Sequence, residues 1–221
     1  AFTDFNGIFE VDDENSVYSS LDGVLYNKNK TTLLQCPTSK TGEYNIPSTV
    51  TLIGYHAFWH CKNLSLINIP NSVISIESGA LAMCTGLTSI TIPSSVISIK
   101  SYAFINSSSF TSIYSFGIVP VDLNSSPGVF INVDKTLCTL YVPYGSKAAY
   151  LAANQWQDFM NIVEMEELSN LAKDSLALVA LYNATNGPNW TKNENWLTGP
   201  VNTWYGVTVE NNRVIGLTLG D

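Results

Sequence analysis

The 221-residue sequence has few charged residues and no excess of positive charge, and both absences limit its functions. Only 13% of the residues are charged, and acidic residues outnumber basic ones, so the formal net charge at pH 7 is −8. Proteins that bind nucleic acid usually present a basic patch to the phosphates. The sequence therefore predicts no nucleic-acid partner. Its 45% hydrophobic content excludes a disordered chain, because that content is enough for a sizeable core.

Long apolar runs and a leader sequence are also missing. No stretch approaches the roughly 20 apolar residues that a membrane-spanning helix needs. The chain begins Ala1-Phe2-Thr3, with neither a Met nor a signal peptide. We therefore expect a processed chain, from which a secretory signal was removed before this numbering begins.

Catalytic and cofactor motifs are absent as well. The sequence contains no Gly-x-Ser-x-Gly motif, no phosphate-binding glycine loop and no Cys–His pair in a known catalytic order. Acidic pairs such as Asp12–Asp13 and Glu166–Glu167 fall in predicted bends or linkers, with no hydrophobic cleft to shift their pKa values. We expect a protein that is not an enzyme, with no catalytic residues and no cofactor.

What the sequence does contain is a repeat with a constant period of 23 residues. Starting at Ile46, it reads IPSTVTLIGYHAFWHCKNLSLIN, IPNSVISIESGALAMCTGLTSIT and IPSSVISIKSYAFINSSSFTSIY. A fixed period in this range is typical of small units that stack on copies of themselves, because one unit alone cannot bury its apolar positions. The repeat therefore predicts a solenoid whose core is the stack itself.

Each repeat predicts two strands and a connecting turn. In Leu-x-x-Ile-x-Ile, Leu87, Ile90 and Ile92 point inward, while Ser89 and Thr91 point outward. Ser-Val-x-x-Ile predicts a second short strand, and Ala-Phe-x-x-Cys a short helical turn. Strands of successive coils run parallel because each coil retraces the previous one. The chirality of parallel crossovers predicts right-handed winding.

Cysteine and histidine in the repeats are candidates for a disulfide bond or a metal site. Cys61 and Cys84 occupy equivalent positions, and Ser107 takes the third. Residues on adjacent coils lie about 4.8 Å apart, so a disulfide is within reach. We favour a buried, reduced column. Cys36 and Cys138, near opposite ends, are not expected to meet. His56 and His60 share a turn, but zinc needs further ligands, so we expect no metal site.

The outward face of the predicted sheet is the candidate ligand-binding surface, because a rigid platform loses little entropy on binding. The first of its two rows is Asn45, Asn68, Thr91, Tyr114 and Tyr141, with Glu10 at the start. The second row is Glu43, Leu66, Ser89, Ser112 and Thr139. The candidate binding residues are Asn45, Leu66, Asn68, Ser89, Thr91, Ser112, Tyr114 and Tyr141. Tyrosine is enriched in binding surfaces. The alternative is that Tyr114 and Tyr141 only pack on each other.

The segments on either side of the repeats predict capping structures. Phe9–Val11 alternates like a strand, and residues 24–26 and 31–35 predict a β-hairpin. After Tyr114 the connection over residues 116–135 exceeds the period and is expected to bulge from the stack, before a last strand in residues 136–143. A short helix within residues 145–164 is expected to cover the open end, with Tyr150, Trp156 and Phe159.

Residues 166–221 predict a separate unit. A helix with an apolar face is expected to stop at residues 186–188, and GVTVENNRVIGLTL predicts two strands around Asn211 and Asn212. Three tryptophans, Trp190, Trp196 and Trp204, are expected to form the core. The face of the helix comprises Leu171, Leu178, Leu181 and Tyr182. The strand from Val214 would have an unpaired edge, which predicts self-association with another chain.

The repeat motifs resemble those of the BspA-like leucine-rich repeats, which belong to surface proteins of Bacteroides and related bacteria. The resemblance spans residues 1–165 and rests on Ile-Pro-x-Ser-Val-x-x-Ile, Ala-Phe-x-x-Cys and Leu-x-x-Ile-x-Ile. The hairpin and the terminal segment of this domain also resemble that family. LVALYNATNGPNW, with WYGV and RVIGLTL, resembles the N-terminal cap and first strand of a second class of leucine-rich repeat. The resemblance implies that this second region continues beyond Asp221.

Together these observations predict an α/β fold. Residues 1–165 would form a right-handed, β-rich leucine-rich-repeat solenoid (a horseshoe) with a parallel sheet, and residues 166–221 a small helix-and-strand capping unit. The resemblance implies a secreted or outer-membrane-associated cell-surface module that uses its sheet face to bind host or neighbouring-cell proteins. Two alternatives remain open. One is a carbohydrate-binding module with exposed aromatic platforms, and the other is a structural spacer that presents a downstream domain.

Overall fold

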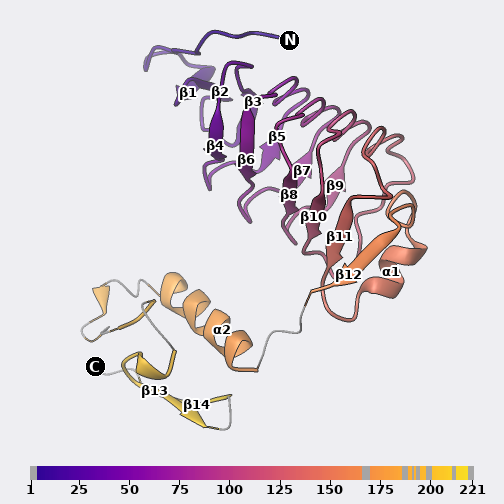
Figure 1. Cartoon of the computed structure of the whole chain (residues 1–221). Helices are drawn as coiled ribbons and strands as arrows, with labels where there is room; N and C mark the ends of the chain where they lie inside the picture. Colours follow the sequence, from indigo (N-terminus) through magenta and orange to yellow (C-terminus); the bar gives the residue numbers. More distant parts are fainter. Residues whose placement is uncertain are drawn as a thin grey trace. The chain divides into compact units, whose positions relative to one another are not determined.

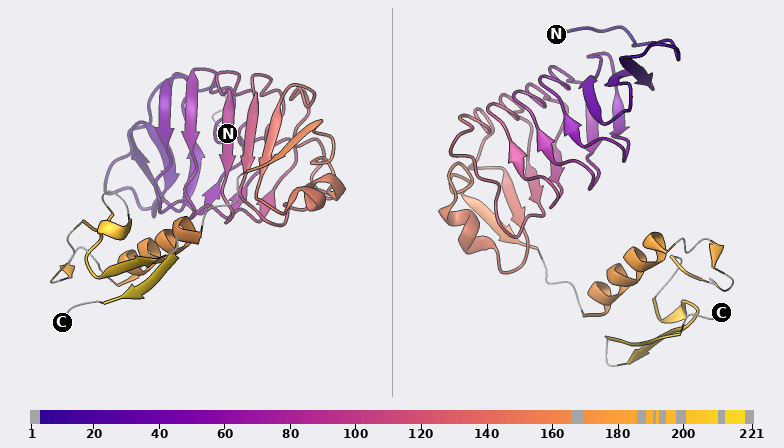
Figure 2. Two further views of the ribbon diagram at one scale, coloured as in Figure 1. Left: turned by 60° about the horizontal axis from the view of Figure 1, so that its bottom comes forward. Right: turned by 180° about the vertical axis from the view of Figure 1, so that it is seen from behind.

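The computed structural model describes residues 4–165, 170–185, 189–190, 192, 195–197, 201–210 and 213–218. The chain divides into two compact units, Ala1–Met165 and Glu166–Asp221. The first is mostly β-structure, built from stacked coils (Figures 1 and 2). Within the described ranges, no helix has the length and apolar character to cross a bilayer.

Each coil of the first unit contributes one strand to each of two sides of the stack. One side carries β4 (Gly42–Asn45) with β6 (Leu64–Asn68), and then β8 (Ser89–Ile92), β10 (Ser112–Ser115), β11 (Thr139–Val142) and β12 (Asn161–Glu164). The other side carries the short strands β5 (Leu52–Ile53), β7 (Ser75–Ile76) and β9 (Ser98–Ile99). All these strands pair in parallel, which confirms the parallel solenoid.

The 23-residue period sets the register of the ladders. Ile90 pairs with Ile113, and Ile53 pairs with Ile76, each one period along the chain. Apolar residues at equivalent positions therefore stack in buried columns between the two sides. Four of these buried columns are Val50, Val73 and Val96; Ile53, Ile76 and Ile99; Ala57, Ala80 and Ala103; and Ile67, Ile90 and Ile113. Alternation along each strand buries Leu87, Ile90 and Ile92, as the pattern predicts.

The Ala-Phe-x-x-Cys segment forms consecutive turns and not the helical turn expected from the sequence. Two positions in each coil have positive φ, which interrupts a right-handed helix. The first is held by His56, Gly79, Tyr102 and Gly128, and the second by His60, Met83, Asn106 and Asn132. Backbone N–H groups in these turns donate to the next coil, as Phe58 does to Ala80 at 2.7 Å and Leu81 to Ala103 at 2.8 Å. The turns thus extend the inter-coil ladder.

The cysteine column is buried and contains no disulfide. All four cysteines are free, and Cys84 Sγ lies 3.1 Å from the carbonyl oxygen of Phe58. Ser107 Oγ makes the matching bond to the Leu81 carbonyl at 2.8 Å. Burial raises the pKa of Cys84, so its thiol stays protonated at neutral pH. The small polar residue at this position therefore caps backbone carbonyls inside the stack.

The N-terminal end differs from the sequence prediction in one strand. Residues Phe9–Val11 form no strand, because only the Phe9 N–H reaches the backbone of the hairpin, at the Gly23 carbonyl (3.0 Å). The predicted hairpin is present as β2 (Val24–Asn27) and β3 (Thr32–Gln35). An additional strand, β1 (Tyr18–Leu21), pairs antiparallel with β2 across Asp22 and Gly23, both with positive φ. Asp-Gly is a strong signal for such a two-residue hairpin turn.

The C-terminal end of the solenoid is more regular than predicted. The connection over residues 116–135 does not bulge throughout, because the Phe104 and Asn106 N–H groups donate to the carbonyls of Val129 and Ile131. Residues 127–133 thus form a fourth copy of the turn. Its positive-φ positions, Gly128 and Asn132, lie 26 residues after Tyr102 and Asn106, so this coil exceeds the 23-residue period by three residues. The last strand is β12 and not β11, since the chain returns after α1 (Lys147–Ala152). The predicted covering aromatics, Tyr150, Trp156 and Phe159, are buried.

The described part of the second unit contains an α-helix, a short 3-10 helix and a hairpin around aromatic rings. Helix α2 spans Asn170–Ala184, a short 3-10 helix spans Val201–Thr203, and β13 (Val207–Glu210) pairs antiparallel with β14 (Arg213–Leu217). The rings of Tyr182, Trp190, Trp196 and Trp204 lie 5.1–5.3 Å apart in successive contacts. Leu178 is buried with them and Leu181 is half-buried. The side chain of Leu171, the predicted stop at residues 186–188 and the turn at Asn211 and Asn212 lie outside the described residues.

Candidate functional site

The predicted rows of outward residues lie on β4, β6, β8, β10 and β11. Asn45 pairs with Asn68, Thr91 with Tyr114, and Tyr114 with Tyr141. The neighbouring row contains Glu43 beside Leu66, and Ser89, Ser112 and Thr139 in succession. The structure assigns β4 and β6 to one sheet, and β8, β10, β11 and β12 to another. We call this outward surface the sheet face.

Side chains on the sheet face differ in exposure. Asn45, Asn68 and Thr91 are exposed, and the other five candidates are half-buried: Leu66, Ser89, Ser112, Tyr114 and Tyr141. Glu10 is not part of the first row, since no strand forms there. Strand β12 adds Asn161 beside Thr139 and Val163 beside Tyr141. The sequence did not predict this extension, because the strand Asn161–Glu164 lay inside the segment expected to be helical.

The rings of Tyr114 and Tyr141 stack along the parallel ladder. Their centroids lie 4.7 Å apart and their planes differ by 9°. This distance matches the spacing of neighbouring strands, so paired residues on parallel strands place their rings face to face. The backbone beneath them is fixed by buried Ile113 and by Ser115, whose Oγ lies 2.7 Å from the Tyr150 hydroxyl. The pair is therefore held on a rigid part of the solenoid.

Amide side chains form a similar ladder at the other end of the sheet face. Asn68 Nδ2 donates to Asn45 Oδ1 at 2.6 Å. A second pair of this kind joins Asn132 Nδ2 to Asn106 Oδ1, also at 2.6 Å, in the turns of the third and fourth coils. Each bond occupies one donor and one acceptor and leaves the remaining amide groups available to solvent or a ligand. The sheet face thus combines amides, hydroxyls and aromatic edges.

The two histidines of the first coil do not form a metal site with their neighbours. Among the described residues, no three His, Cys, Asp or Glu side chains are grouped so that they could hold an ion. His56 lies between the rings of Tyr55, with centroids 3.8 Å apart, and Trp59, 4.2 Å apart. His60 contacts Asp4 Oδ1 at 2.5 Å and the sulfur of Met83. Both imidazoles therefore serve as packing and hydrogen-bonding groups.

His56 gives a testable dependence of stability on pH. Burial lowers the pKa of His56, and its Nδ1 has no hydrogen-bond partner. The unfolded chain has an ordinary imidazole pKa of about 6.5, so below that pH the unfolded state binds more protons than the folded state. The free energy of unfolding should therefore fall as the pH drops from about 6.5 toward the folded-state pKa.

Urea denaturation at several pH values measures this effect. His56→Gly, which puts at this position the residue found at Gly79 and Gly128, should make the acid-side slope shallower. His60→Asn is the matched control, because Asn106 and Asn132 occupy its equivalent positions with positive φ. That variant keeps His56 and should keep the fall in stability. An unchanged slope in His56→Gly would contradict the assignment.

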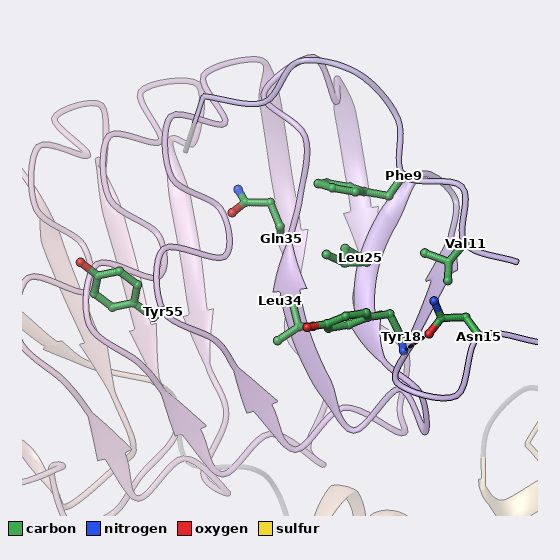
Figure 3. A pocket seen from close by; sticks show the side chains of 8 residues that line it. All are labelled: Phe9, Val11, Asn15, Tyr18, Leu25, Leu34, Gln35 and Tyr55. Carbon is green, nitrogen blue, oxygen red and sulfur yellow. Dashed lines mark hydrogen bonds between the residues drawn. The ribbon is translucent and has the colours of Figure 1, made fainter. Parts of the chain in front are cut away.

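A pocket lies beside the N-terminal hairpin. It has a volume of about 500 Å³ and is shown in Figure 3. Its walls come from the N-terminal segment, the hairpin strands and the first coil: Phe9, Val11, Asn15, Tyr18, Leu25, Leu34, Gln35 and Tyr55. The sequence pattern alone did not predict this pocket. The Asp22-Gly23 turn is the signal that could have revealed it, because this turn pairs β1 with β2 and so brings Tyr18 and the preceding Asn15 to the hairpin.

Comparison with known protein families identifies the repeats. Residues 29–120 match the model of the BspA-type leucine-rich repeat region, in 6 copies. This stretch of the chain is similar to BspA-type repeats. The match covers the hairpin from Asn29 and the regular coils, where the stacked strands and turns described above lie. No match was found among curated proteins.

A solved structure of a bacterial leucine-rich repeat protein shares the fold, and two others show weaker similarity. A leucine-rich repeat protein from Eubacterium ventriosum is 32% identical, with a TM-score of 0.53, over 62% of this chain and 36% of its own. The pneumococcal vaccine antigen PcpA is 18% identical, with a TM-score of 0.48, over 72% of this chain and 50% of its own. A leucine-rich cell surface protein from Faecalibacterium prausnitzii is 19% identical, with a TM-score of 0.40, over 70% of this chain and 41% of its own. This chain thus spans half or less of each relative's length.

Proposed function

We propose that this chain is a non-catalytic binding module of a secreted or cell-surface bacterial protein, and that its sheet face contacts another protein. Proteins with BspA-type repeats are typically exposed on the surface or secreted. The partner class is a protein of a host or of a neighbouring cell, so the activity is adhesion. The observation that carries the proposal is the stacked pair Tyr114 and Tyr141 on a rigid ladder.

The stacking geometry favours a protein partner over a sugar. A carbohydrate platform offers the flat face of an aromatic ring. Here the faces of Tyr114 and Tyr141 cover each other, and the row neighbours on either side are Thr91 and Val163. The pair therefore presents ring edges and hydroxyls. Rigid, amphipathic edges of this kind are typical of protein-binding surfaces.

The composition of the rest of the sheet face supports the same partner class. An unbroken Ser and Thr surface would favour a spacer, but the rows also contain Asn45, Asn68, half-buried Leu66 and 44% exposed Val163. Mixed polar and apolar character on a flat, preformed surface is what protein interfaces use, since the binding residues need no further ordering.

The double replacement Tyr114→Ala/Tyr141→Ala tests the proposal. We expect binding to weaken by more than about 1 kcal/mol, the loss typical of aromatic anchors. The ligand would first be identified by a binding screen that covers extracellular-matrix proteins and a glycan array. Affinity would then be measured for the parent chain and the double variant. Folding should change little, because both side chains are on the outward side of the ladder.

Tyr144→Ala is the matched control, since Tyr144 is 62% exposed and lies outside the rows of the sheet face. It should bind like the parent chain. Equal affinity of the double variant and the parent would move the site away from the tyrosine pair. Binding only on the glycan array would favour the carbohydrate module, and no binding in either screen would favour the spacer.

Self-association is a second proposed contact, through the second unit. Strand β14 pairs with β13 alone among the described residues, so no second strand lies along its other edge there. Ile215 on this strand is 58% exposed. Such edges template pairing with another chain unless a charge blocks them.

Light scattering over a range of concentrations measures this association. Ile215→Lys should keep the chain monomeric at concentrations where the parent associates, because charged side chains protect sheet edges. Leu176→Lys is the control: Leu176 has the same exposure of 58% but lies on α2. If the parent chain is already monomeric throughout, edge pairing does not occur.

A further inference from the structure

The pocket beside the N-terminal hairpin has features of a binding site that the sheet face does not share. Three parts of the chain build it: the segment with Phe9 and Val11, the hairpin with Leu25 and Leu34, and the first coil with Tyr55 (Figure 3). The Phe9 N–H bond to Gly23 and the Val11 N–H bond to Ser20 Oγ, both 3.0 Å, hold the first segment against the hairpin. A volume of about 500 Å³ lies within the range of ligand pockets.

The walls are mainly apolar, and no charged side chain lines the pocket. Two of its aromatic side chains remain largely exposed in the free protein, Tyr18 at 45% and Tyr55 at 59%. Covering exposed apolar surface is favourable by about 25 cal/mol per Å². The pocket therefore favours an apolar group, and aliphatic Leu25 and Leu34 distinguish it from a sugar site.

Two carboxamides in the pocket have defined orientations. Asn15 Oδ1 accepts hydrogen bonds from the backbone N–H groups of Val17 (2.9 Å) and Tyr18 (2.8 Å), which leaves its Nδ2 as the donor. Gln35 is buried, and its Nε2 donates to the Cys36 carbonyl at 3.1 Å. A carboxamide both donates and accepts. Each carboxamide can bond a peptide group, Asn15 through its Nδ2 donor and Gln35 through its carbonyl acceptor.

The charge around the pocket is negative. Asp12, Asp13 and Glu14 lie between two lining residues, Val11 and Asn15, and all three are exposed. Residues 4–35 contain six carboxylates and two lysines. One of these lysines, Lys28, donates to the backbone carbonyl of Asp13 and so lies at the acidic bend, but the six carboxylates still outnumber the two lysines. A negative rim steers and retains a cationic partner.

We propose that this pocket binds a segment of a partner protein in which a large apolar side chain is flanked by lysine or arginine. The apolar side chain packs between Tyr18, Tyr55 and Leu34. Peptide groups on either side of it bond to the carboxamides of Asn15 and Gln35, which line different sides of the pocket (Figure 3), and the basic residue pairs with the acidic bend at residues 12–14. None of the sheet-face residues lines the pocket, so this contact is separate from the proposed sheet-face interface.

NMR of the full chain with ¹³C-labelled methyl groups tests the proposal, using three blocked tetrapeptides. Acetyl-Lys-Phe-Leu-Lys-amide should shift the methyl signals of Val11, Leu25 and Leu34 in a saturable way. Acetyl-Glu-Phe-Leu-Glu-amide should bind about tenfold more weakly, because its charges face the acidic bend. Acetyl-Lys-Gly-Ser-Lys-amide should cause no saturable shift, because it lacks the apolar group.

The variant Tyr55→Ala should weaken binding of the first peptide by about fivefold or more, as for an aromatic contact. Tyr144→Ala, with a similarly exposed ring outside the pocket, should bind like the parent chain. Equal affinity for the Lys and Glu peptides, or no effect of Tyr55→Ala, would overturn the proposal. So would methyl shifts with chitotriose but with no peptide, or shifts that depend on protein concentration alone. These outcomes leave the sheet-face proposal intact, because its test uses different residues.

Discussion

Replacing Ile90 by Ala is expected to lower the free energy of unfolding by about 2–5 kcal/mol, the cost of large-to-small changes in a packed core. Ile90 is 1% exposed, and on β8 it pairs with Ile113, which is fully buried. Ile67 occupies the equivalent position on β6. Removing the side chain therefore leaves a cavity inside a column that continues through neighbouring coils.

Ile97→Ala on the next coil makes the same chemical change on the surface, since Ile97 is 74% exposed. It should change the stability by less than about 0.5 kcal/mol, as for other surface substitutions. Urea denaturation of the parent and both variants gives the comparison. A loss below about 0.5 kcal/mol in Ile90→Ala would show that the inward and outward positions have been assigned wrongly.

The regular coils could be predicted because every repeat supports the same assignment. A 23-residue period with Ile90 and Ile113 in phase leaves one register for the parallel strands, since a shift of one residue would expose the buried face. That register also placed the outward rows within the regular coils, including Thr91 beside Tyr114. The strand register could be predicted because equivalent positions recur in every coil, and not because of the secondary-structure propensity of any one segment.

The capping segments could not be predicted in the same way, because they lack copies to compare. Strand β12 is held by pairing with β11, and Met165 N–H donates to the Val142 carbonyl at 2.8 Å, contacts that a local pattern does not reveal. The fourth turn, residues 127–133, was missed because extra residues precede it and Val129 replaces the alanine of the earlier coils. Insertions hide a repeat even when the ladder continues.

The N-terminal pocket was missed for a related reason. Its lining residues come from three segments that are distant in sequence, and they meet only because β1 folds back on β2. Tyr18 and Tyr55, taken singly, look like ordinary surface aromatics. A site made from different elements depends on tertiary structure, whereas the sheet face depends only on the repeat.

Close packing between coils at Gly86 gives the second prediction with a large effect on stability. A Cβ atom added to Gly86 would lie 2.2 Å from the Lys62 carbonyl oxygen and 2.6 Å from that of Leu64. Both are backbone atoms of the preceding coil, so no flexible side chain can move away to relieve the contact. Gly86→Ala should therefore force the two coils apart and cost about 1–3 kcal/mol, as overpacking does elsewhere.

Ser109→Ala is the matched control for Gly86→Ala. Ser109 lies one period after Gly86, and its backbone already accommodates a Cβ. The control should lie within about 0.5 kcal/mol of the parent chain. If both variants unfold at the same urea concentration as the parent, the coils can separate there without cost. If both lose stability equally, the effect lies in the turn and not in the contact between Gly86 and the carbonyls of the preceding coil. Only a loss confined to Gly86→Ala agrees with the close approach of the two coils.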